Sequence, residues 1–283
     1  MALPTYAGPL ERSWYYAFRI ICAAIFVFLI APILIIIPLS FNAQPYFTFT
    51  REMLTFDPAG YSLRWYQDFW QSASWQASIR NSFIIAIGAT IVATTLGTLA
   101  ALGLSRSHMP FRAAIMGVLI SPMIVPLIIS AAGMFFFYSK INLAQTYTGV
   151  ILAHAALGTP FVVITVTATL SGFDHSLTRA AASLGADPTT TFFKVTMPLI
   201  LPGIISGALF AFITSFDEVV IVLFLAGVEQ RTIPREMWSG IREAISPTIL
   251  AVATILIAIS VLLLVSLELL RRRNERLRGI QET

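Results

Sequence analysis

Two adjacent carboxylates, Asp217 and Glu218, lie within an otherwise apolar stretch, TSFDEVVIVLF. They fall about 14 residues into a predicted membrane span, which at 1.5 Å per residue is roughly 21 Å from Gly203. An ionisable group inside the hydrocarbon costs several kcal/mol unless it is paired or hydrated, so the pair is a candidate functional site. Negative charge at that depth would attract a cationic solute.

The two side chains cannot share this role equally, because neighbours on a helix point about 100° apart. One carboxylate could line a pathway while the other pairs with a partner helix. Alternatively, the pair makes an inter-helix hydrogen bond or an ion pair with a second subunit. The candidate pathway residues are Thr214, Ser215, Phe216, Asp217 and Glu218.

Other polar residues give little sign of catalytic chemistry. The three histidines fall in different segments, with no Cys, Asp or Glu at ligand spacing, so no metal site is predicted. The only lysines, Lys140 and Lys194, do not follow a glycine loop, so the chain has no Walker A sequence. If ATP drives this protein, another subunit must supply the ATP site, and the chain itself is expected to carry no cofactor and no enzyme activity. A membrane enzyme would need clustered polar residues that the sequence lacks.

Composition indicates an all-α, polytopic membrane protein with one transmembrane domain over 1–283. The chain is 57% hydrophobic and 11% charged, whereas a soluble domain carries about 25% charged residues. The single cysteine, Cys22, excludes an intrachain disulfide. Six segments reach the roughly 20 apolar residues that a span needs: about 19–41, 79–104, 113–138, 146–170, 199–226 and 247–270.

The basic residues predict the orientation. With both termini in the cytoplasm, eleven of the 18 Lys and Arg residues fall inside, five of them in 271–278. That cluster would anchor the last span at an anionic lipid leaflet. The net charge of +4 thus reflects topology, and nothing suggests binding of nucleic acid.

The spans and their outer link carry further patterns. Small residues and hydroxyls in 79–104 predict packing against protein, and Pro122 and Pro126 predict a bend in 113–138. Outside, the sequence SLRWYQDFWQ in 42–78 predicts an aromatic helix that lies on the membrane interface. This helix could be an aromatic-belt anchor or a contact for an external binding protein.

The polar link 171–198 is the most ordered connection that the sequence predicts. Asp174 or Ser176 can cap a first helix over 177–184, and Gly185 stands where a C-terminal glycine belongs. Asp187 followed by proline predicts the start of a second helix that runs to about residue 195. The orientation places this link in the cytoplasm.

The link TRAAASLGADPTTTFFKVTMP resembles the EAA loop of ABC-importer permeases: Glu-Ala-Ala, three residues, Gly, nine residues, then Ile-x-Leu-Pro. Arg179 stands in place of the glutamate, which reverses a charge, while Val195 and Met197 are conservative replacements. In that family the loop docks on the ATPase subunit. The resemblance therefore implies a coupling role for Arg179, Ala180, Ala181, Gly185, Ala186 and Pro198.

The resemblance covers most of the chain. Within the family, the chain is most similar to spermidine/putrescine permeases of the PotC type, in the segments SFDEVVIVLFLAG and TIPREMWSGIREAISPTILAVAT. The family implies six helices in the type I importer (MetI-like) fold in a bacterial inner membrane. Its implied partners are a second homologous permease, two ATPase subunits and a solute-binding protein outside. It implies transport by alternating access of a small cationic solute such as a polyamine.

Three alternatives remain open. Related permeases import iron, thiamine, opines and amino-acid derivatives. A stand-alone secondary transporter would also explain the carboxylates, but it does not explain the link 171–198, and no internal repeat is visible. The link could instead rest on the inner leaflet, although LTRAAASL offers little apolar bulk to bury in lipid.

Overall fold

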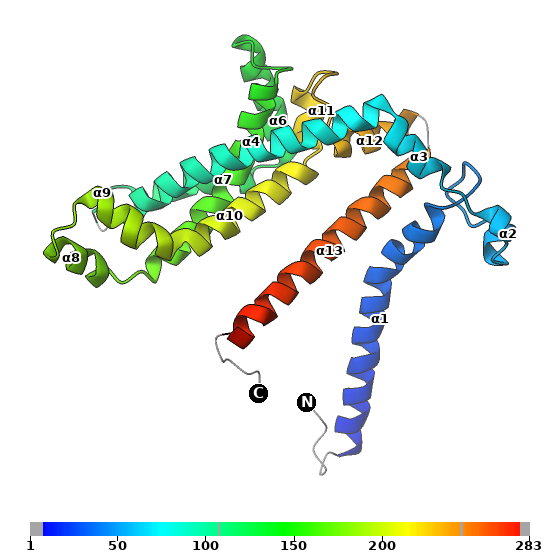
Figure 1. The fold of residues 1–283 in the computed structure, drawn as a ribbon, viewed down its shortest axis with the longest axis horizontal. Helices are drawn as coiled ribbons and strands as arrows, with labels where there is room; N and C mark the ends of the chain where they lie inside the picture. The colour runs from blue at the N-terminus through cyan, green and yellow to red at the C-terminus, as the bar shows by residue number, and fades with distance from the viewer. Residues whose placement is uncertain (1–7, 107, 244–245, 278–283) are drawn as a thin grey trace. The chain divides into compact units, whose positions relative to one another are not determined.

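The computed structural model describes residues 8–106, 108–243 and 246–277, and these residues are mostly helical. They form two compact units, one made of residues 73–239 and one made of the two ends of the chain, up to residue 72 and from residue 240. Figure 1 labels the elements along the chain.

Four helices are long and apolar enough to cross a membrane. They match four of the six predicted spans: α1 (Pro9–Leu39), α4 (Ala73–Leu104), α7 (Tyr147–Ser171) and the continuous helix Pro188–Asp217, which contains α10 (Met197–Asp217). The sixth predicted span lies in α13 (Thr248–Leu277), whose apolar part over the fully described residues is Thr248–Leu262.

The predicted third span is broken. It consists of α5 (Arg112–Ile124) and α6 (Leu127–Lys140), which meet at a bend of 102°. Val125 is extended, as the residue before a proline tends to be, and Pro126 has no N–H to continue the helix. The sequence predicts a bend here, but the pair is a sharply broken span or a re-entrant loop and not one straight helix.

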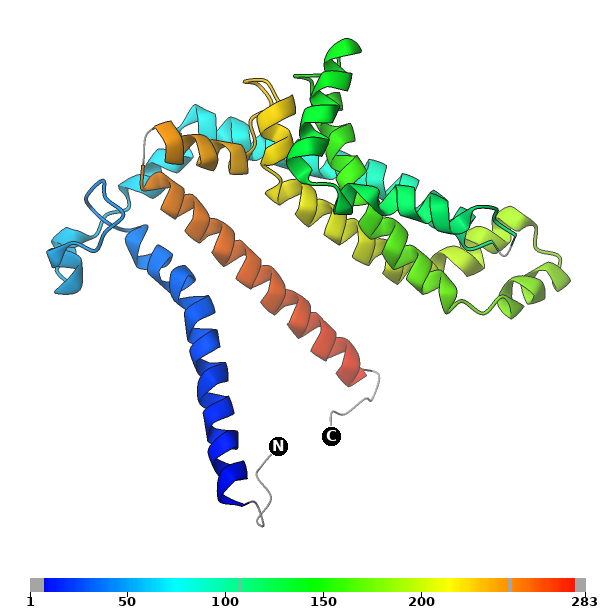
Figure 2. The same cartoon turned by 180° about the vertical axis from the view of Figure 1, so that it is seen from behind.

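The core of the 73–239 unit is a bundle of α4, α7 and α10, which lie side by side in both views (Figure 1 and Figure 2). Small residues allow the close approach: a Cβ at Gly97 would lie 2.6 Å from Val162 Cβ, and one at Gly207 would lie 2.8 Å from Val162 Cα. The prediction that 79–104 packs against protein is confirmed. Within its apolar window α7 is 61% buried against 33% for α4, so α7 is the central helix.

A second apolar cluster joins α6, α7 and the short α11 (Val220–Leu225). Ile221, Val222 and Leu225 of α11 are fully buried there. The chain then turns through 226–232 and begins α12 (Ile233–Glu243). Helix α11 therefore packs one face into this unit, although the sequence predicts it as the end of the span 199–226.

The other unit contains α1, α13 and the segment between α1 and α4. That segment forms α2 (Arg51–Leu54), the 3-10 turn η1 (Pro58–Gly60) and α3 (Arg64–Gln71). The predicted aromatic helix is present as α3, and its place on the membrane interface stays a prediction. Phe69 faces inward at 3% exposure while Trp70 is 60% exposed, and Thr248 of α13 donates a hydrogen bond to Asp68 Oδ2 at 2.7 Å.

Candidate functional site

The link 171–198 folds into two helical pieces joined by a tight turn. Helix α8 (Ser176–Ser183) begins after Asp174, whose carboxylate accepts hydrogen bonds from the Ser176 N–H at 2.8 Å and the Ser176 hydroxyl at 2.6 Å. These bonds lower the pKa of Asp174. Of the two predicted caps, Asp174 is therefore the residue that accepts.

Gly185 ends α8 in a Schellman motif. It has φ +84°, its N–H donates to the Ala182 carbonyl at 3.0 Å, and the Ala186 N–H donates to the Ala181 carbonyl at 3.1 Å. Nothing lies within 4 Å of a Cβ built on Gly185. The turn therefore needs glycine for its backbone conformation and not for space.

Asp187 caps the second piece as predicted. The Thr190 N–H donates to Asp187 Oδ1 at 2.8 Å and the Thr190 hydroxyl donates to Oδ2 at 3.1 Å, which lowers the pKa of Asp187. Helix α9 (Pro188–Thr191) does not stop near residue 195 as predicted. It continues through a π-helical turn, η2 (Phe192–Thr196), directly into α10, because the wider turn accommodates Pro198, which has no N–H to donate.

The candidate coupling residues lie on the surface of this element, and Pro198 lies in the first turn of α10. Arg179, Ala180, Gly185 and Pro198 are exposed, and Ala181 and Ala186 are half-buried. Two large apolar side chains are also exposed, Leu184 at 89% and Phe193 at 63%. A hollow of about 360 Å³ lies between α8 and the α9–η2 segment. Exposed apolar bulk beside a hollow is typical of a surface that meets another protein.

The carboxylate pair lies at a helix break and not in mid-helix. Helix α10 ends at Asp217, and Glu218 has the extended backbone of a cap, so the predicted continuous span over 199–226 is wrong at this point. Glu218 Oε1 accepts hydrogen bonds from the N–H groups of Val220 at 2.5 Å and Ile221 at 3.0 Å. The carboxylate thereby caps α11, which ends the α10 helix without proline or glycine.

The break separates the two carboxylates. Glu218 is 8% exposed and engaged by backbone amides, whereas Asp217 is exposed. Among the other candidates, Ser215 is buried and its hydroxyl lies 2.8 Å from His154 Nδ1 of α7. Phe216 is half-buried and stacks against Phe212, while Thr214 is half-buried.

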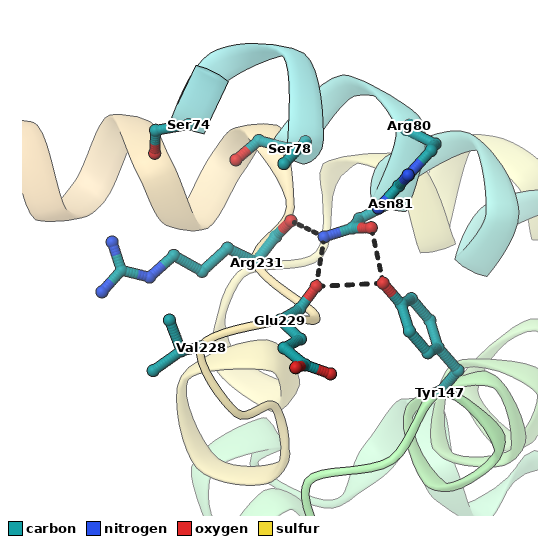
Figure 3. A pocket seen from close by; sticks show the side chains of 9 residues that line it. Ser74, Ser78, Arg80, Asn81, Tyr147, Val228, Glu229 and Arg231 are labelled. Carbon is teal, nitrogen blue, oxygen red and sulfur yellow. Dashed lines mark hydrogen bonds between the residues drawn. The ribbon is translucent and has the colours of Figure 1, made fainter. Parts of the chain in front are cut away.

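A cavity of about 650 Å³ lies between the first turns of α4 and the 228–231 loop (Figure 3). Asn81 Nδ2 donates to the carbonyls of Glu229 at 2.6 Å and Arg231 at 2.9 Å. The Tyr147 hydroxyl lies 2.8 Å from Asn81 Oδ1 and 3.0 Å from the Glu229 carbonyl. The loop is therefore fixed to both α4 and α7.

The start of α12 is held in the same way. The Ile233 N–H donates to Ser82 Oγ at 2.8 Å. Glu236 accepts from the Ser74 hydroxyl and pairs with Arg231 at 3.5 Å. Sequence reasoning missed this network because its members are about 150 residues apart. The available signal was an amide, Asn81, next to Ser82 inside an apolar segment.

Comparison with known proteins fits this architecture. The sequence model of the family described as "Binding-protein-dependent transport system inner membrane component" matches residues 93–276. The chain belongs to this family. It is 30% identical over 250 residues to the spermidine/putrescine transport system permease protein PotC of Haemophilus influenzae, covering 88% of this chain and 94% of the relative.

Other relatives agree. The putrescine transport system permease protein PotI of Escherichia coli K12 is 31% identical over 266 residues, covering 90% of this chain and 92% of the relative. A solved bacterial ABC transporter involved in import of the acidic polysaccharide alginate matches with a TM-score of 0.73 at 15% identity, over 95% of this chain and 99% of that one. The likeness confirms the expected MetI-like permease fold.

This membership confirms the expected class. The chain is a permease subunit of a bacterial, binding-protein-dependent ABC importer, a transporter and not an enzyme, and an inner-membrane component with several apolar helices. The carboxylate pair, the coupling residues and the solute remain predictions.

Proposed function

We propose that this subunit forms half of the translocation pathway for a small cationic solute such as a polyamine. A second homologous permease would form the other half, and two ATPase subunits that bind ATP and Mg would drive alternating access. A solute-binding protein would deliver the solute from outside. Both termini would then lie in the cytoplasm, as the basic residues predict.

The observation that carries the choice of solute is the end of α10. Its last four carbonyls have no intrahelical partner and form the negative end of the helix dipole. The exposed Asp217 carboxylate stands at the same place. The negative charge of the Asp217 carboxylate and the partial negative charge of the α10 C-terminus thus lie together, and both favour binding of a cation. The charge of Glu218 is different, because the N-terminus of α11 compensates it.

This asymmetry separates the roles of the two carboxylates. We infer that Asp217 is the one that attracts the solute, with the Phe216 ring beside it as an apolar wall. The similarity to the spermidine/putrescine permease and the putrescine permease supports a polycationic solute. Asp217 lies at a break between two helices, and secondary transporters also form their solute sites at the ends of broken helices.

Coupling to the ATPases is proposed for the link 171–198. Its turn is fixed by local caps, it exposes Leu184 and Phe193, and it joins α10 without a break. An ATPase movement that displaced α8 and α9 would therefore be passed along one helix to Asp217.

The experiment is uptake by the whole importer reconstituted in liposomes with its binding protein and ATPases. Asp217→Asn should raise the KM for labelled putrescine or spermidine by about tenfold, the loss of roughly 1.4 kcal/mol of attraction, with assembly unchanged. Glu229→Gln, an exposed acid on the 226–232 loop, is the matched control. If Asp217→Asn takes up the solute as well as the Glu229→Gln control does, Asp217 does not attract the solute in the pathway. Uptake by the permease alone on an ion gradient would favour a secondary transporter.

A further inference from the structure

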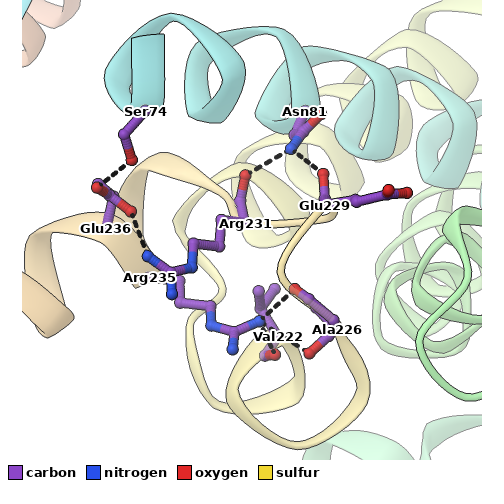
Figure 4. Close-up of polar contacts among 9 residues, drawn as sticks. Ser74, Asn81, Val222, Ala226, Glu229, Arg231, Arg235 and Glu236 are labelled. Carbon is purple, nitrogen blue, oxygen red and sulfur yellow. Dashed lines mark hydrogen bonds and ion pairs between the residues drawn. The ribbon is translucent and has the colours of Figure 1, made fainter. Parts of the chain in front are cut away.

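Helix α11 is short and carries an acidic cap at one end and a basic clamp at the other. At its N-terminus the Glu218 carboxylate accepts from two backbone amides. At its C-terminus Arg235 Nη1 donates to the carbonyls of Ala226 at 2.8 Å and Gly227 at 2.9 Å, with Val222 at 3.4 Å (Figure 4). Each charge has the sign that the helix dipole favours at that end.

A helix of this length depends on such partners. Four N–H groups and four carbonyls at the ends of any α-helix have no intrahelical partner, and α11 has six residues. Isolated helices so short are unstable. The side chains of Ile221, Val222 and Leu225 are fully buried against α6 and α7, whereas Leu223 and Phe224 are each 38% exposed. The two charged side chains accept from and donate to backbone groups at the two ends of α11 that have no intrahelical partner.

Arg235 is itself anchored. It follows the segment 229–233, which Asn81 and Tyr147 fix through the Glu229 carbonyl and which Ser82 fixes through the Ile233 N–H. The guanidinium therefore reaches α11 from a base that is tied to α4. The chain of contacts runs from α4 through Arg235 to α11, and from α11 through Glu218 to the end of α10.

We propose that Arg235 and Glu218 are positioning residues for transport. Their hydrogen bonds hold α11 in place, and α11 in turn fixes the position of the end of α10, where Asp217 lies. The part of this proposal that is measured by uptake rests on the proposed function, transport of a cationic solute. Glu218 then acts as an acceptor of backbone hydrogen bonds and not as a ligand of the solute. Arg235 acts through the hydrogen bonds that its Nη1 donates and not through net charge alone.

The Glu218 half of the proposal is tested by two substitutions in the reconstituted importer. Glu218→Gln keeps an acceptor oxygen for the two amides but loses the charge, so uptake should stay within about threefold of wild type. Glu218→Leu removes the acceptor and should reduce uptake about tenfold or more. If Gln and Leu are equally impaired while both complexes assemble, the negative charge itself is required and the positioning role of Glu218 is overturned.

The Arg235 half is tested by Arg235→Met and Arg235→Lys, with Arg242→Met as a control, since Arg242 is exposed on the same helix. Hydrogen exchange of the 220–227 amides in the whole complex should rise about tenfold in Arg235→Met, less in Arg235→Lys, and not in the control. Uptake should fall in the same order. Unchanged exchange in Arg235→Met would overturn the clamp.

The two readouts separate this proposal from the proposed function. Hydrogen exchange needs no solute, so it tests the clamp even if the wild-type importer moves no polyamine, a result that would sink the choice of solute alone. If wild type does transport, and Arg235→Met exchanges faster but takes up solute normally, the clamp exists but does not position the pathway.

Discussion

Replacing Gly185 tests whether the turn between α8 and α9 couples the permease to its ATPases. The residue has φ +84°, and a left-handed conformation costs an L-residue about 1–2 kcal/mol. Because an added Cβ would meet no atom within 4 Å, the whole effect is backbone strain. A shift of 1–2 kcal/mol changes the population of the formed turn by about 5–30-fold.

The substitutions form a graded series. Asparagine tolerates the left-handed region and should be close to wild type, alanine should be intermediate, and the β-branched valine should be worst. In proteoliposomes Gly185→Val should lower both uptake and binding-protein-stimulated ATP hydrolysis by about 5–30-fold. Gly103→Val is the control, because Gly103 also has open space but lies in regular helix. A Gly185→Val importer as active as Gly185→Asn would refute the coupling role of the turn.

Two further predictions concern packing and pH. Gly97→Ala would place a Cβ 2.6 Å from a side-chain carbon of α7, and this overpacking should cost about 1–3 kcal/mol; thermal unfolding in detergent should show a lower Tm, whereas Gly103→Ala should not. Hydrogen bonds from Thr190 lower the pKa of Asp187 in the folded protein. The Asp187 cap therefore stabilises the folded element fully above the unfolded pKa of about 3.9, and this stabilisation is lost as the pH falls through the lower folded pKa. Amide exchange at Thr190 should therefore rise only in that acidic range and be pH-independent in Asp187→Ala, after correction for intrinsic exchange; no difference between the two proteins would contradict the capping role.

Local signals in the sequence predicted the link 171–198 well. The N-terminal caps, the glycine in left-handed conformation and the Asp-Pro start act within three or four residues of each other, so their outcome hardly depends on the rest of the fold. The predicted start of α8 differs from the observed one by a single residue. The family resemblance was carried by this same segment.

The break at Glu218 could not be predicted from hydropathy, because TSFDEVVIVLF contains no proline or glycine. Helix α10 ends because the Glu218 carboxylate accepts hydrogen bonds from the backbone amides of Val220 and Ile221. The apolar run that follows packs as a separate short helix. An acid before an apolar run is nevertheless a cap signal. The network around Asn81 depends on contacts between distant segments, which no local pattern contains.

The π-helical turn at Phe192–Thr196 has a geometric consequence for how the importer can evolve or be engineered. Such a turn holds one residue more than an α-helical turn, so it acts as a built-in insertion. Deleting one residue there would restore regular winding and leave the segments on either side facing nearly as before, whereas deleting one residue elsewhere in α10 would rotate everything before it by about 100° around the helix axis. The direction in which α8 faces, relative to Asp217 at the far end of a helix about 45 Å long, can thus survive the loss of one residue in this turn but not in the regular turns of α10.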